Sequence, residues 1–131
     1  ADGVQMGTRF VACKESSAHE NFKNMILKAK EGDTRLTLKE ITPVRMMKNK
    51  FYQEIEELYK TSPSKEQLLN KLGKGRAKLG MFEGDLDAGE LEIGQSSSQI
   101  NKVFTAKEII QQIMTEFDSI KSQMLIANKF N

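Results

Sequence analysis

The sequence has one cysteine, no tryptophan and almost no excess of charge. Because Cys13 has no second cysteine to pair with, an internal disulfide and a cysteine-based zinc site are excluded, and a reducing compartment, the cytoplasm, is expected. The 20 basic and 18 acidic residues leave a net charge of +2, which predicts binding neither to nucleic acid nor to an anionic membrane surface. No long apolar run is present, so a transmembrane helix is not expected.

The chain does have enough apolar sequence for one core, together with clear helix signals. Of its 131 residues, 38% are hydrophobic and 29% are charged, which is typical of a soluble globular domain. Residues of the type that cap helix N-termini stand three positions before Glu or Gln in three places, Ser17–Glu20, Ser64–Gln67 and Thr105–Glu108. Apolar residues follow at helical spacing. The sequence therefore predicts helices at about 17–31, 50–60, 64–73 and 105 to 122–127, with a broken or short helix in the glycine-rich stretch 73–84.

The last predicted helix carries the strongest apolar pattern. Its apolar residues recur every three or four positions and predict a buried stripe, formed by Ile109, Ile110, Ile113, Met114, Phe117 and Ile120.

Strand signals are few. Residues 3–6 predict a strand that ends near Met6 or Gly7 in a tight turn, and 34–42 predict short extended segments that Pro43 interrupts. One good strand candidate is too little for a complete α/β domain, because a parallel strand needs neighbours on both sides. We therefore expect the chain to be part of a larger protein.

Two stretches resemble a known family. The opening "ADGVQMGTRF" and the following "ESSAHENFK" closely resemble a segment of the FMN-dependent nitronate monooxygenases, formerly called 2-nitropropane dioxygenases. That family includes FMN-dependent enoyl-acyl carrier protein reductases. The stretch "EGDLDAGELEIGQSSSQI" resembles a second segment of the same family. The similarity is strongest over residues 1–32 and 82–100 and weak over 34–81.

The resemblance implies an α/β fold, the C-terminal portion of an FMN-binding (β/α)8 barrel with a small, mostly helical inserted domain. Residues 1–32 are expected to supply the last barrel strand and its helix. Residues 33–92 are expected to form the small helical substrate or lid domain, and 93–131 to return to the barrel and end in the long helix. The part of the fold present here is expected to be predominantly α-helical, with an upstream barrel segment of the same protein as its partner.

The resemblance also implies a cofactor site at Gln5, Met6, Gly7 and Thr8. In such barrels a phosphate commonly lies in the loops after the last strands. A glycine lets the backbone approach an anion, and the amides of Gly7 and Thr8 with the Thr8 hydroxyl can donate hydrogen bonds to phosphate oxygens. A Gly-Thr pair alone indicates only a plain turn after a strand.

Gln95 and Ser96 are the second part of the implied FMN site. They follow a glycine-rich connection that, by resemblance, returns to the barrel face, and the alternative is that they cap a helix at 97–101. No metal site is predicted: an EF-hand loop that starts at Asp85 fails, because Glu90 stands where glycine is needed and Ser96 where a bidentate glutamate is needed.

No catalytic residue is expected in this chain. By resemblance, the family's active-site histidine belongs to a G-G-H motif upstream of the region present here, so it has no counterpart in this sequence. His19 is instead expected to cap or pack a helix. The resemblance implies that the intact protein is a flavoprotein oxidoreductase, a nitronate monooxygenase that acts on a small molecule. This chain alone is expected to be inactive. An alternative is an enoyl-acyl carrier protein reductase with NAD(P)H and an acyl-thioester substrate. A non-catalytic helical interaction module is the alternative from another class.

Overall fold

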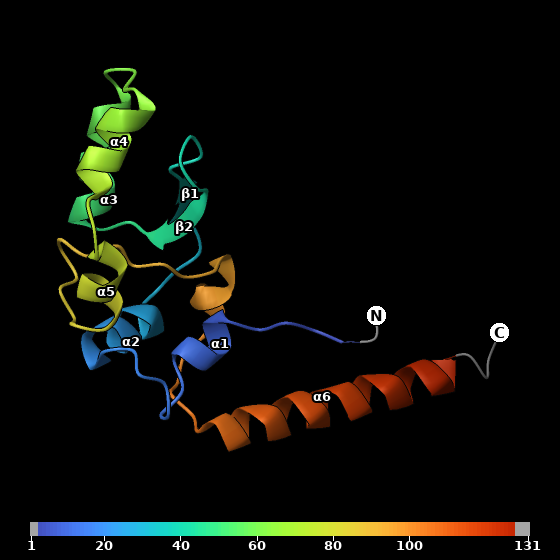
Figure 1. Ribbon diagram of the computed structural model, residues 1–131. Helices are drawn as coiled ribbons and strands as arrows, with labels where there is room; N and C mark the ends of the chain where they lie inside the picture. The colour runs from blue at the N-terminus through green and yellow to red at the C-terminus, as the bar shows by residue number, and fades with distance from the viewer. Residues whose placement is uncertain (1–2, 128–131) are drawn as a thin grey trace.

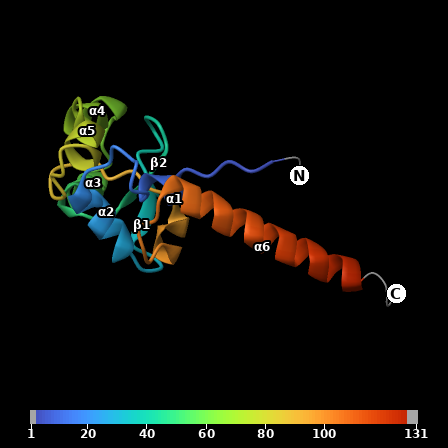
Figure 2. The same cartoon turned by 90° about the horizontal axis from the view of Figure 1, so that it is seen from below.

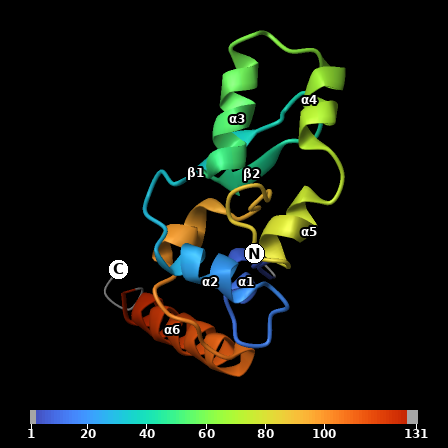
Figure 3. The same cartoon turned by 90° about the vertical axis from the view of Figure 1, so that its left-hand side faces the viewer.

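The computed structural model describes residues 3–127 and is predominantly helical, as predicted (Figure 1). The elements follow in the order α1 (Thr8–Val11), α2 (Glu20–Leu27), β1 (Thr34–Thr37), β2 (Val44–Met47), α3 (Lys50–Tyr59), α4 (Lys65–Leu72), α5 (Arg76–Met81), the 3-10 helix η1 (Gln95–Gln99) and α6 (Ala106–Ala127). Helices α3 and α4 lie at one end of the molecule and α6 at the opposite end (Figure 3).

The apolar residues form two cores, one on each side of the β-hairpin. The first core surrounds α2 and takes residues from the loop after α1, from β2 and from the connection to η1: Ala12, Ala18, Phe22, Ile26, Met47, Leu91 and Ile93. The second joins the hairpin to α3 and α4: Leu38, Met46, Phe51, Tyr52, Ile55 and Leu68. Adjacent strand residues face opposite sides of the sheet, so Met46 and Met47 each serve a different core.

The sheet is a two-stranded antiparallel hairpin in which Thr34 is opposite Met47. The extended segments predicted on either side of Pro43 are therefore confirmed. Residues 91–93 run along the other edge of β2, where Met47 N–H donates to Leu91 O at 2.9 Å and Ile93 N–H to Arg45 O at 3.0 Å. This backbone pairing places the connection to η1 against the hairpin.

Local chemistry sets the bounds of α3 and α4, close to those predicted. Ser64 and Gln67 form the complete capping box at the start of α4. Asn49 caps α3, since its Oδ1 accepts from Tyr52 N–H at 2.9 Å. The Asn49 amide also donates to the carbonyls of Leu86 and Gly89, each at 2.8 Å. This buried side chain thereby joins the start of α3 to the loop after α5.

The short helix α5 confirms the broken helix predicted for 73–84. Gly75 begins it in the left-handed conformation, with φ of 75°. Gly80 packs so closely on Gly89 that a Cβ on Gly89 would lie 2.1 Å from the Gly80 Cα, so neither position has room for a side chain. Next to this contact Glu90 is buried, and desolvation, with the nearby Glu92 carboxylate, raises its pKa to about 6.

The predicted strand at residues 3–6 is wrong. These residues have no regular secondary structure, and the bend after them opens the helical turn α1. A strand exists only through hydrogen bonds to a neighbour, and within residues 3–127 no strand lies beside this segment.

The predicted cap of α2 is also wrong. His19, not Ser17, is its N-cap, with Nδ1 accepting from Asn21 N–H at 3.1 Å. The backbone N–H of His19 donates to Met81 O at 2.7 Å. This contact with α5 fixes where α2 can begin, which the local pattern does not contain. The expectation that His19 caps a helix is confirmed.

The predicted stripe on α6 is apolar, but most of it is not buried. The Thr105–Glu108 capping box is confirmed by hydrogen bonds in both directions, at 2.7 and 3.1 Å. Ile109 is buried and Ile113 is half-buried, whereas the rest of the predicted stripe is exposed: Ile110, Met114, Phe117 and Ile120. Helix α6 projects from the body of the molecule on the same side as the N-terminal segment (Figure 2).

Candidate functional site

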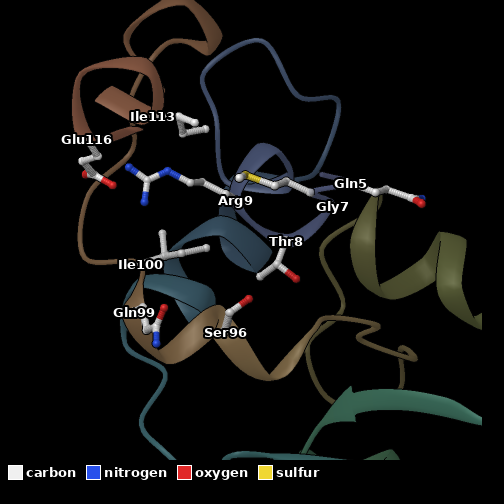
Figure 4. A pocket seen from close by; sticks show the side chains of 10 residues that line it. Gln5, Gly7, Thr8, Arg9, Ser96, Gln99, Ile100, Ile113 and Glu116 are labelled. Atoms are coloured by element: carbon white, nitrogen blue, oxygen red, sulfur yellow. The ribbon is translucent and has the colours of Figure 1, made fainter. Parts of the chain in front are cut away.

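A pocket of about 400 Å³ lies where the first segment, η1 and α6 meet (Figure 4). The first segment supplies its floor from Gln5 to Arg9. Helix η1 and the residue after it supply one wall, and α6 supplies another. The wall residues are Ser96, Gln99, Ile100, Ile113 and Glu116. The pocket therefore depends on three segments that are far apart in the sequence.

Five of the six residues predicted to bind a cofactor line this one pocket: Gln5, Met6, Gly7, Thr8 and Ser96. The sixth, Gln95, is exposed at the start of η1 and is not among the lining residues. Helix η1 begins two residues earlier than the helix proposed at 97–101, and Gly94 is its N-cap without a side-chain hydrogen bond. Neither Gln95 nor Ser96 therefore caps it.

Thr8 and Gly94 connect the two parts of the predicted site. Gly94 N–H donates to Thr8 Oγ1 at 3.1 Å, across 86 residues of sequence. A Cβ on Gly94 would lie 2.4 Å from Thr8 Oγ1, so the Thr8 hydroxyl leaves no room for a side chain at this glycine, and Ser96 Oγ lies in ordinary contact at 3.9 Å. Since Thr8 Oγ1 accepts from Gly94, its own proton remains available to donate to a ligand.

The bend at Gly7 offers further donors. Gly7 O accepts from the N–H groups of Phe10 and Val11 at 3.0 and 3.1 Å. Within residues 3–127, no hydrogen bond uses the N–H of Gly7, Thr8 or Arg9. Three amides and a hydroxyl in one bend are suited to an anion with several oxygens, such as a phosphate.

The charges at the pocket are of both signs. Arg9 extends away from Thr8 toward Ile113 and Glu116 (Figure 4), and its Nη2 donates to Gln112 Oε1 at 2.7 Å. Its Nε is buried and has no partner among the described residues. The Glu116 carboxylate disfavours an anion at its own end of the pocket, so the bend is better suited to an anion than the α6 wall is.

Two more contacts hold the start of α6 against the loop that follows α1. Lys14 N–H donates to Phe104 O at 2.9 Å, and Ala106 N–H donates to Glu15 Oε2 at 2.9 Å. The bond from the Ala106 amide stabilises the carboxylate and lowers the pKa of Glu15. With the Arg9–Gln112 bond, these contacts fix α6 relative to the bend.

A second hollow, of about 380 Å³, borders the same bend from the side of the hairpin. Gly7 and Thr8 line both hollows. Gly94 lines the second hollow and contacts Thr8. Its walls come from the end of α1, the start of β2 with the proline before it, and the segment that pairs with β2. They are Val11, Pro43, Val44, Arg45, Glu92 and Ile93. The hairpin thus approaches the bend directly.

The sequence analysis did not place Gly94, Arg9, Ile113 or Glu116 in the site. Arg9 and Gly94 did carry a signal, because each lies in one of the two stretches that resemble the family, and Ile113 was predicted only as part of the apolar stripe of the last helix. In the part of the chain that the structure covers, no group of three metal-ligating side chains could hold a metal ion. No described helix is both long and apolar enough to span a membrane.

Comparison with known proteins decides the family. A family model described as nitronate monooxygenase matches residues 1–116. The chain belongs to the nitronate monooxygenase family. The resemblance seen in its two motifs is therefore confirmed, and both lie inside the matched range.

Relatives of this nitronate monooxygenase family member are longer than the chain. It is 32% identical to a probable nitronate monooxygenase of Bacillus subtilis, over 88% of the chain and 33% of the relative. It is 31% identical to one of Staphylococcus saprophyticus, over 94% of the chain and 34% of the relative. The solved structure of FabK from Thermotoga maritima matches with 34% identity and a TM-score of 0.81, over 95% of the chain and 39% of FabK. The chain thus spans between a third and two fifths of these proteins.

Proposed function

We propose that these residues form the phosphate-binding end and the covering unit of an FMN-dependent oxidoreductase of the nitronate monooxygenase type. The observation that carries the proposal is the bend at Gly7 and Thr8. These two residues line one pocket, and their amides have no hydrogen-bond partner among residues 3–127. Family membership supports the same reading, since it is a family of oxidoreductases.

In this proposal the chain binds and orients the cofactor. The Gly7 and Thr8 amides and the Thr8 hydroxyl hold the phosphate of FMN, and Gln5, Met6 and Ser96 line its surroundings. The Gly94 amide fixes the direction of the Thr8 hydroxyl. FMN, when bound, supplies the redox chemistry by taking electrons from the substrate.

The proton chemistry is assigned to residues outside this chain. His19 uses Nδ1 to cap α2, and it is not among the residues that line the pocket. A base that takes a proton from the substrate must reach that proton directly or through one water. We therefore expect residues 1–131 alone to bind FMN weakly and to have no activity.

Residues 33–92 are proposed to be the unit that covers the flavin, and 93–131 the return to the barrel. The second hollow supports this division, since the hairpin reaches the bend at Val44 and Arg45. The occupant of that hollow is proposed to be the small-molecule substrate.

The phosphate site can be tested by comparing FMN with riboflavin, which lacks the phosphate. In the whole protein that carries these residues, Thr8→Val removes the hydroxyl and Thr8→Ser keeps it. We expect FMN binding, followed by quenching of flavin fluorescence, to weaken about tenfold in Thr8→Val, because a charge-assisted hydrogen bond contributes about 1.5 kcal/mol. Riboflavin affinity is expected to stay constant in both variants. Equal FMN affinities would contradict the proposal.

The second candidate function is the reduction of enoyl thioesters by NAD(P)H through FMN, as in enoyl-acyl carrier protein reductases. The similarity to FabK favours it, with 34% identity and a TM-score of 0.81. Two assays on the whole protein separate the candidates. Oxygen uptake with an alkyl nitronate supports the monooxygenase, and NADH oxidation that requires an enoyl thioester supports the reductase. A protein that binds no FMN and shows neither activity supports a non-catalytic interaction module.

A further inference from the structure

A small hollow of about 30 Å³ adjoins the first pocket, and we call it the Arg9 hollow. Arg9 and Ile109 line it, together with the connection between η1 and α6, at residues 99–102 and Phe104. Its volume is about the space that one water molecule takes in the liquid. The hollow therefore has room for one small ligand, and neither a phosphate group nor a flavin ring fits.

The guanidinium group of Arg9 has fewer acceptors than its donors require. Its Nη2 donates to Gln112 Oε1 at 2.7 Å, whereas its Nε is buried and has no partner among the described residues. Arg9 also forms no ion pair with a carboxylate within residues 3–127. A buried donor without an acceptor is costly, and native proteins satisfy such groups with a residue, a water molecule or an ion. The hollow beside Arg9 is a place for such an acceptor.

The charges around the hollow favour an anion over a water molecule. Arg9 and Lys102 bring two positive charges to it, and no aspartate or glutamate lines it. Lys102 Nζ lies 5.1 Å from the centre of the Phe104 ring, a contact that keeps its side chain next to a residue of the wall. The side-chain amides of Gln99 and Asn101 can donate as well. Two cations and two amides in one small space stabilise a negative charge.

The carboxylates closest to this region serve other partners. Glu108 Oε2 accepts from the Thr105 N–H at 2.7 Å and from the Thr105 hydroxyl at 2.8 Å. These hydrogen bonds are the main cause of the lowered pKa of Glu108, to which the charge of Lys102 adds. Glu116 lines the first pocket and not the Arg9 hollow. Neither carboxylate is therefore the acceptor that Arg9 Nε requires.

We propose that the Arg9 hollow binds one small monovalent anion, chloride in the cell, which accepts hydrogen bonds from the Arg9 guanidinium. Because Nε is buried, a small rotation of the Arg9 side chain accompanies binding. The site is separate from the proposed phosphate site, since neither Gly7 nor Thr8 lines the hollow. The proposal therefore does not depend on the flavin.

The anion also affects the first pocket. Arg9, Gln99 and Ile100, which are labelled in Figure 4, line both the Arg9 hollow and the first pocket. A ligand that joins Arg9 to the connection after η1 holds one wall of the first pocket against α1. Chloride is therefore expected to stabilise the folded protein and this wall together.

The first test is crystallographic and uses the whole protein that carries these residues, crystallised with bromide in place of chloride. Bromide has the same charge and nearly the same size, and its anomalous scattering distinguishes it from water. We expect one anomalous peak inside the Arg9 hollow, within hydrogen-bond distance of the Arg9 guanidinium.

The second test measures the binding in solution, by denaturant unfolding of the whole protein without flavin. Sodium gluconate, whose anion is too large for the hollow, replaces sodium chloride at constant ionic strength. A ligand at ten times its dissociation constant lowers the unfolding equilibrium constant about tenfold. We expect this chloride effect in the unchanged protein and in Lys107→Gln, a control that loses the same charge outside the hollow.

Two variants remove parts of the site itself. In Lys102→Gln we expect chloride to bind about threefold more weakly, since one partly exposed charge is lost. In Arg9→Gln we expect the chloride effect to disappear. If Arg9→Gln does not fold, the comparison of Lys102→Gln with Lys107→Gln decides.

Four results would overturn the proposal. The hollow could hold a water molecule without an anomalous signal, or an oxygen atom of the same polypeptide bonded to Arg9. Bromide could lie only at the bend of Gly7 and Thr8. The chloride effect could be equal in Lys102→Gln and the control. Since both readouts are obtained without flavin or turnover, a failure of the proposed function leaves them intact.

Discussion

The variant Gly7→Ala tests whether glycine at this position is required for folding or for binding a ligand. Gly7 has φ of −99° and ψ of −61°, a conformation that alanine adopts readily, and a Cβ there would have no atom within 4 Å. The chain itself therefore gives no reason for glycine at this position. The reason we infer is the close approach of an anion to the backbone.

The structure sets the size of each effect. Replacing glycine by alanine in a permitted conformation stabilises a protein by about 0.4–1 kcal/mol, because the unfolded chain loses freedom. A methyl group in the bend pushes a phosphate away from the amides and weakens one or two charge-assisted hydrogen bonds, each of about 1.5–3 kcal/mol. We therefore expect FMN affinity to fall about 10- to 100-fold while the free energy of unfolding stays equal or rises.

The assay is a pair of measurements on the whole protein. Chemical denaturation without flavin gives the free energy of unfolding, and fluorescence titration gives the affinities for FMN and riboflavin. Gly3→Ala is the matched control, since a Cβ at Gly3 also meets nothing and Gly3 does not line the pocket. An FMN affinity within twofold of the unchanged protein, or an equal loss for riboflavin, would refute the reasoning.

Three further predictions concern the stability of the fold. Gly94→Ala should lower the free energy of unfolding by about 1–3 kcal/mol because its Cβ meets Thr8 Oγ1 at 2.4 Å, and Thr8→Ala in the same chain should recover part of that loss in denaturant unfolding. Asn49→Ala should cost about 2–4 kcal/mol in the same assay, because it leaves the Tyr52 amide and two carbonyls without their buried partner. Glu90, with its pKa raised to about 6, binds a proton more tightly when folded, so stability should fall as pH rises from about 4.5 to 6. Glu90→Gln should flatten this pH dependence and add at most about 2 kcal/mol at pH 7, and a slope that persists in the variant would exclude Glu90 as its source.

Where a cap is local, the sequence was sufficient to predict it. Ser64–Gln67 and Thr105–Glu108 form the predicted pairs because each bond joins residues three positions apart. The start of α2 was missed because the bond from His19 N–H to Met81 O spans 62 residues. No pattern within one helix contains that contact.

The same distinction explains the stripe on α6 and the first segment. Periodicity shows which face of a helix is apolar, and it predicted that face of α6 well. It does not show what covers the face, so the expected burial failed at Ile110 and Phe117. Strand propensity at residues 3–6 likewise needs a neighbouring strand before it becomes structure.

The candidate site was predicted through resemblance and not through spacing. The Gly-Thr pair alone indicates a turn, and only the resemblance to the family motif predicted a phosphate site there. The links that make one pocket of it join Thr8 to Gly94 and Arg9 to Gln112, over 86 and 103 residues. Such pairs are invisible in one sequence, which is why Arg9 and the α6 wall were missed.

The contacts of Asn49 have a consequence for how this protein can change over generations. Its amide reaches Gly89 O, so the chain from α3 to the end of α5 leaves and returns at one point. Lengthening or shortening the α3–α4 tip changes only the segment between these two residues, whose ends stay joined by the hydrogen bond. Natural variation can therefore reshape that tip, far from the bend, while the arrangement at Gly7 and Thr8 stays unchanged.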